Sequence, residues 1–164
     1  MPPLHPAFVH FPIALVVFSF ITDLLNRLFD RPSLRATGSW TLLGALVFGA
    51  ITATTVYYDM VRLRPVLGDT FRYVDFHMDV GWVLVGAVVV LTAWRWLIYA
   101  PKDRTPGIPY LVAALLVMGL TLFPGWYGGE MVYSQGAGVA ATGKGTEPAA
   151  DGKKVLDKVT KSGE

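Results

Sequence analysis

The chain has 164 residues, of which 53% are apolar and only 16% are charged. Soluble domains carry about 25% charged residues, so this composition excludes an ordinary water-soluble domain. The sequence contains no cysteine, which excludes disulfides, iron–sulfur clusters, thiolate zinc sites and covalently attached c-type haem in this chain. The net charge is +2, and the basic residues are spread over loops and tail, so no stripe favours nucleic-acid binding.

The apolar residues fall into four continuous blocks, and a membrane-spanning helix needs about 20 such residues. The blocks predict an all-α fold, an integral membrane four-helix bundle. Pro12 in the first block is expected either to start the regular helix or to bend it. We expect a transmembrane domain over residues 5–139 and a polar, flexible C-terminal tail over residues 140–164. The first block covers residues 7–25 and contains Asp23, and the uncharged parts of the other three are residues 36–58, 80–94 and 105–129.

The loop charges predict the orientation of the bundle. Six basic residues follow the first and third blocks, whereas three lie on the other side; because Lys and Arg favour the cytoplasm, the first set is expected there. This places both termini outside, as in a multi-pass protein of a bacterial inner membrane with periplasmic ends. The six are Arg27, Arg31, Arg35, Arg95, Lys102 and Arg104, and the three are Arg62, Arg64 and Arg72.

The three histidines, His5, His10 and His77, all fall on the predicted outward side. His10 and His77 each precede an inner arginine by a similar number of residues, so both are expected about 25–27 Å above it. Two imidazoles at one level on different helices can share a ligand. Ionisable residues within a span usually face the bundle interior, and bundles build cofactor sites between facing helices.

Without cysteine, non-covalent haem b is the simplest redox cofactor, and His10 and His77 are the expected axial iron ligands. Gly81, one turn after His77, would give a flat macrocycle room against its helix. Arg62 is expected to contact the haem propionates, with His5, Asp59, Asp79, Glu130 and Tyr133 around the site. Such a subunit would pass electrons from a membrane donor such as quinol to a periplasmic acceptor. No catalytic residues are expected, since no nucleophile–base pair, phosphate loop or HExxH motif is present.

Other interpretations remain open at this point. The histidines could simply hydrogen-bond across helices, or bind a non-haem metal with Asp79 or Glu130. The protein could also be a cofactor-free accessory subunit of a larger membrane complex.

Two further charged residues are expected to have structural roles. Asp23 is expected to pair with Arg27 at i+4. Arg95 is expected to extend toward the inner surface and to stack on a neighbouring indole.

Two stretches resemble a known family. His5 to Ala14, HPAFVHFPIA, is similar to the opening signature of a bacterial family of predicted membrane proteins, the domain of unknown function 2231. Gly128 to Tyr133, GGEMVY, and residues 136–139, GAGV, look like its closing signature. The resemblance covers about residues 5–139 and implies four membrane helices. The family also occurs beside or fused to c-type cytochrome domains, which implies a redox partner. Many relatives have histidine where this chain has Gln135, so a ligand role there is not carried over.

Overall fold

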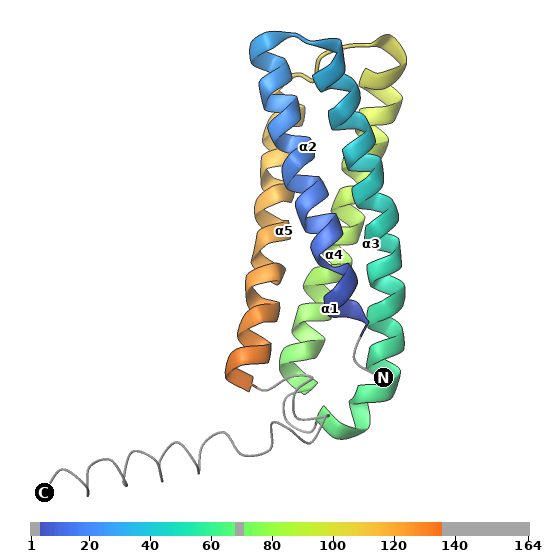
Figure 1. Cartoon of the computed structure of the whole chain (residues 1–164), viewed down its shortest axis with the longest axis vertical. Helices are drawn as coiled ribbons and strands as arrows, with labels where there is room; N and C mark the ends of the chain where they lie inside the picture. Colours follow the sequence, from blue (N-terminus) through green and yellow to red (C-terminus); the bar gives the residue numbers. More distant parts are fainter. Residues whose placement is uncertain (1–3, 68–70, 136–164) are drawn as a thin grey trace, which may run out of the picture.

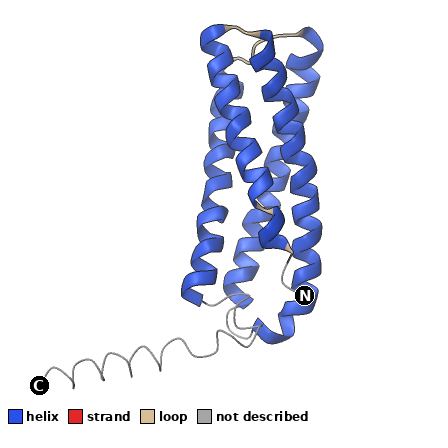
Figure 2. Cartoon of the chain, viewed as in Figure 1, coloured by secondary structure: helices blue, strands red, loops and turns tan. Residues whose placement is uncertain are grey.

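A computed structural model describes residues 4–67 and 71–135 of the chain. The side chains of residues 62–67, 71 and 135 are not described, and the expected tail at 140–164 lies outside the described residues. Every regular element in the described part is helical (Figure 2). The elements are α1 (His5–Phe8), α2 (His10–Phe29), α3 (Pro32–Leu67), α4 (Phe71–Trp94), the π-helical η2 (Arg95–Tyr99), the 3-10 helix η3 (Ala100–Lys102) and α5 (Ile108–Gln135).

Four helical segments are long and apolar enough to cross a membrane, which confirms the predicted all-α bundle of four spans. They are His5–Phe29, Pro32–Val61, Arg72–Lys102 and Ile108–Ser134. Many large apolar side chains remain exposed on the bundle surface, among them Leu97 at 73% and Leu116 at 69%. In water such a surface would be unfavourable, so these side chains contact the lipid of the bilayer. The chain is a multi-pass membrane protein.

The helices run up and down, so the described chain begins and finishes at the same end of the bundle (Figure 1). We call this the terminal end. It holds α1, the end of α3, the start of α4 and the end of α5. The opposite end, the loop end, carries the α2–α3 turn and the η3–α5 loop. Both ends of the membrane domain therefore lie on one side of the bilayer.

Helices α1 and α2 are nearly continuous and are interrupted at Val9, which keeps helical dihedral angles. The interruption precedes Pro12, which lacks the N–H that would bond to the carbonyl of Phe8. Pro124 lies inside α5 without ending it. The first span is therefore interrupted close to Pro12, whereas α5 continues past Pro124.

Two aspartates with left-handed backbones form the turns at the loop end. Asp30 has φ 44° and its N–H bonds to the Asn26 carbonyl at 2.8 Å; Asp103 has φ 45° and bonds to the Ala100 carbonyl at 3.1 Å. Arg35 forms ion pairs with both, at 3.9 Å to Asp30 and 3.2 Å to Asp103. Asp tolerates this conformation better than most residues, and Arg35 holds the two turns together.

The bundle core near the loop end contains a buried ion pair rather than apolar side chains alone. Arg95 Nη2 lies 2.7 Å from Asp23 Oδ1, and the two side chains are 1% and 0% exposed. Arg95 Nε also donates to Ser39 Oγ at 3.0 Å, and its guanidinium lies 5.5 Å from the centre of the Tyr110 ring. The pair joins α2 to the start of η2 across the interior of the bundle.

Both sequence predictions for these charges were therefore wrong. Asp23 pairs with Arg95 and not with Arg27, which is exposed. Arg95 is fully buried over a tyrosine ring and does not extend outward onto an indole. An i+4 pair on an exposed helix face contributes only tenths of a kcal/mol, whereas a buried charge requires a partner, and so the burial of Asp23 decides the pairing.

Candidate functional site

The structure pairs His77 with His5, and not with His10. The His5 and His77 ring centres are 6.0 Å apart, with the ring planes at 82°. His10 is exposed, and its Nδ1 lies 3.0 Å from the carbonyl of Pro6. Five residues separate the two N-terminal histidines, which is about 140° around a helix. When His5 faces the bundle, His10 must therefore face away, and the expected His10–His77 pair is corrected on this ground.

Asp59 fixes the position of the histidine in α1. Its Oδ2 accepts the backbone N–H of His5 at 2.7 Å, and Asp59 is only 5% exposed. The His5 N–H is at a helix start, where it has no partner within the helix. The carboxylate of α3 supplies that partner and attaches α1 to the bundle.

His77 is positioned by α5. Its ring stacks on Tyr127, with the ring centres 6.3 Å apart and the planes at 13°. A methyl group added at Gly128 would lie 3.3 Å from His77 Cε1, closer than most such contacts. The absence of a side chain at Gly128 therefore lets the His77 ring lie against α5.

The two rings share an unusual feature. Nδ1 of His5 and Nδ1 of His77 are both buried and have no hydrogen-bond partner among the described residues. Buried polar atoms are nearly always paired, so each exception needs an explanation. Two such atoms in one pair of touching imidazoles point to a group that both rings could bind.

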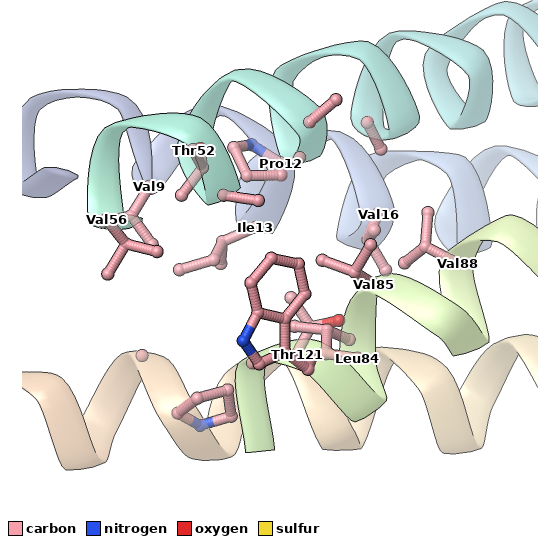
Figure 3. A pocket seen from close by; sticks show the side chains of 18 of the residues that line it. Val9, Pro12, Ile13, Val16, Thr52, Val56, Leu84, Val85, Val88 and Thr121 are labelled. Carbon is pink, nitrogen blue, oxygen red and sulfur yellow. The ribbon is translucent and has the colours of Figure 1, made fainter. Parts of the chain in front are cut away.

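An apolar groove has this histidine pair in its lining. Figure 3 shows side chains from α2, α3, α4 and α5 that point into it. Its cavity volume is about 230 Å³, and of its described lining residues only His5, His77, Thr52 and Thr121 are neither apolar nor glycine. Both threonine hydroxyls donate to carbonyls of their own helices, at 2.8 and 2.7 Å. The groove therefore offers apolar contacts along its length, with the imidazoles at one end.

Small residues give the groove its width. Gly81 lines it one turn after His77, and a methyl group added there would meet nothing within 4 Å. Gly49 on α3 has equally open space. Gly81 therefore leaves room beside α4 next to the histidines.

The other predicted residues lie around the site less closely. Asp79 and Tyr133 are exposed, Tyr133 at 90%. Glu130 is exposed and accepts a hydrogen bond from Ser134 on its own helix. Arg62 belongs to α3, and its side chain is not described. Of the residues expected around the histidines, Asp59 is the one with a direct bond to His5.

Residues 4–67 and 71–135 contain no group of three or more His, Cys, Asp or Glu side chains that could hold a metal ion. The non-haem alternative, in which His10 and His77 act with Asp79 or Glu130, is therefore not assembled among the described residues. The histidine pair provides two nitrogen ligands.

The sequence reasoning gave His5 a minor role because it precedes the apolar block. The helical angle between His5 and His10 indicates that the two rings cannot face the bundle together. The packing of the helices then decides which of the two does. The groove could not be predicted, because its walls come from four helices whose facing residues are unknown before the bundle is assembled.

The comparisons with known proteins agree with this architecture. A family model described as a predicted membrane protein, DUF2231, matches residues 1–141. No curated protein and no solved structure matches the chain.

Proposed function

The chain belongs to the DUF2231 family of predicted membrane proteins, and we propose that it is a haem b-binding electron-transfer subunit in which His5 and His77 would hold the haem iron. The single observation that carries this proposal is the pair of buried, unpartnered imidazole nitrogens at the end of an apolar groove. Neutral imidazole is a common axial ligand of haem iron.

The separation of the two rings fits a shared iron. With metal–nitrogen distances of about 2 Å, two imidazoles on one metal ion have ring centres about 5–6.5 Å apart. The observed 6.0 Å lies in this range. Nδ1 of His5 is buried and has no hydrogen-bond partner among the described residues, so it is the nitrogen that we propose as the ligand; the second ring nitrogen of a ligating histidine typically forms a hydrogen bond.

The groove fits the apolar edge of a flat macrocycle. Its walls run along α4 from His77 to Val89, which is about 18 Å at 1.5 Å per residue. The histidines lie at the terminal end of the groove, and Arg62 of α3 and Arg72 of α4 belong to the same end of the bundle; we propose them as the residues that would bind the propionates. Haem bound there would supply a one-electron carrier.

This chain's residues would hold the ligands and exclude water. Asp59 keeps α1 against α3 through the His5 N–H, and Gly128 lets the His77 ring lie on α5. The apolar walls would give the iron a dry environment, and burial is one of the means by which proteins set haem potentials.

The test is the absorbance spectrum and pyridine haemochrome content of the protein purified in detergent from cells supplied with haem. We expect a haem b spectrum in the wild type and in His10→Ala, and its loss in His5→Ala and His77→Ala. His10→Ala is the matched control, because that residue is exposed and its Nδ1 lies near the carbonyl of Pro6 rather than near His77. Loss in His10→Ala with retention in His5→Ala would restore the original pair and refute this one.

A second pair of variants tests the groove. Gly81→Leu would fill it beside His77, whereas Gly86→Leu, on the same helix, adds the same side chain at an exposed position that does not line it. We expect haem to be lost only in Gly81→Leu. A folded wild type without a Soret band in cells that supply haem would refute haem binding and leave the accessory-subunit alternative.

The proposed donor is a membrane quinol and the proposed acceptor a periplasmic protein, such as a c-type cytochrome. This rests on the loop charges, which favour a bacterial inner membrane with both termini in the periplasm. The cysteine-free sequence allows a direct test with Ser134→Cys and Ser33→Cys, two exposed positions at opposite ends of the bundle. In cells with a permeabilised outer membrane, an impermeant maleimide should label only Ser134→Cys; labelling of Ser33→Cys alone would invert the orientation.

A further inference from the structure

A second cavity lies at the loop end, far from the histidine pair. It has a volume of about 220 Å³ and lies between the start of α3 and the η2–η3 segment. Its lining includes Arg35, Ser39, Trp40, Arg95, Trp96 and Arg104. Three arginines line one cavity, with Asp103 as the carboxylate in the lining.

Two of its lining side chains have N–H groups without an acceptor. Arg95 is 0% exposed and uses Nε and Nη2 for Ser39, Asp23 and the carbonyl of Arg35. Its Nη1 has no hydrogen-bond partner in the described part of the chain, and the same holds for Trp96 Nε1. Both groups can only donate, so a group with oxygen acceptors would satisfy them.

The charges at the cavity leave one arginine unpaired. Arg95 pairs with Asp23, and Arg35 pairs with Asp30 and Asp103. For Arg104, no carboxylate lies within ion-pairing distance among residues 4–67 and 71–135. The local charges therefore provide one exposed guanidinium whose counterion is missing, next to two buried donors.

The backbone of this segment is also unusual. Residues Arg95–Tyr99 form a π-helix, and π-helical turns occur frequently at functional sites. This turn continues α4 at the loop end of the bundle. Beside the cavity, Trp40 is 63% exposed and Leu97 is 73% exposed, so apolar surface for acyl chains adjoins it.

We infer that this cavity binds the phosphate of an anionic phospholipid from the leaflet at the loop end. Basic pockets between transmembrane helices recognise such headgroups. Arg104 contacts the phosphate from the exposed side, Arg95 and Trp96 donate to its oxygens, and the acyl chains lie along Trp40 and Leu97. This site is independent of the proposed haem site at the terminal end.

The experiment measures thermal stability of the full chain in dodecylmaltoside as dioleoylphosphatidylglycerol, dioleoylphosphatidylcholine or inorganic phosphate is added. We expect phosphatidylglycerol to stabilise the wild type, with little effect of the zwitterionic lipid or of free phosphate. Arg104→Gln and Trp96→Phe should each weaken the apparent affinity for phosphatidylglycerol about tenfold, as expected for loss of a hydrogen bond to a charged group.

Matched controls separate this site from general electrostatic attraction. Arg31→Gln removes an exposed arginine at the same end outside the cavity, and Trp126→Phe removes an indole N–H at the terminal end. Both should bind phosphatidylglycerol as the wild type does. Equal weakening by Arg31→Gln and Arg104→Gln would overturn the inference, because only net charge would then matter. Equal stabilisation by inorganic phosphate would overturn the lipid assignment and identify a free anion as the ligand.

Discussion

Removing one member of the buried ion pair should destabilise the bundle strongly. Asp23→Asn keeps the size of the side chain and removes its charge, leaving Arg95 in the core without a carboxylate. The Nη2–Oδ1 distance is 2.7 Å and both side chains are almost fully buried, so solvent cannot replace the lost partner. Breaking such a pair costs about 3–5 kcal/mol of unfolding free energy. Intact, the pair joins α2 to η2.

The double variant Asp23→Leu/Arg95→Met distinguishes the cost of an unpaired charge from the value of the pair itself. Replacing both members of a buried pair by apolar side chains of similar volume is often neutral or stabilising. We therefore expect the free energy of unfolding of the double variant to be closer to that of the wild type than the free energy of unfolding of Asp23→Asn is. The remaining difference would come from Ser39 Oγ and the Arg35 carbonyl, which lose the arginine as a donor.

The assay is equilibrium unfolding in mixed micelles of dodecylmaltoside and increasing sodium dodecyl sulfate, followed by far-UV circular dichroism. Asp79→Asn is the control, because this aspartate is exposed and surface substitutions usually change stability by less than about 0.5 kcal/mol. If Asp23→Asn cost no more than this control, or if the double variant were the least stable of the three, the buried-pair argument would be wrong.

Three further substitutions test close contacts. Gly38→Ala would direct a methyl group into Asp23 and should lower the free energy of unfolding by about 1–3 kcal/mol in the same assay. Gly49→Ala adds its methyl group in open space and should be neutral. Equal costs of the two substitutions would contradict the packing. Gly128→Ala should displace His77 and lower haem occupancy without unfolding the bundle, and unchanged occupancy would refute its positioning role. Asp59→Ala removes the acceptor of the His5 N–H and should increase amide hydrogen exchange in α1; unchanged exchange would show that the bond does not hold α1.

The sequence predicted the four spans because hydrophobic length alone specifies them, and the structure agrees. It paired His77 with His10 by their expected heights, whereas the structure places His5 beside His77. Height along a helix does not give the direction of a side chain. The predicted partner of Asp23 was wrong for a related reason. The sequence shows Arg27 at i+4, whereas the actual partner, Arg95, lies 72 residues away (95 minus 23) on another helix. Pairings between helices depend on how the bundle packs, which one sequence does not display.

The interruption at Val9 has a consequence for how the histidine pair could be completed. His5 belongs to a segment of one helical turn, and a hydrogen bond from its backbone to Asp59 holds that segment against α3. A small rotation about the interruption would separate the two imidazoles while the four long helices kept their packing. Insertion of a prosthetic group would then be a late step in biogenesis, taken by a bundle already assembled in the bilayer.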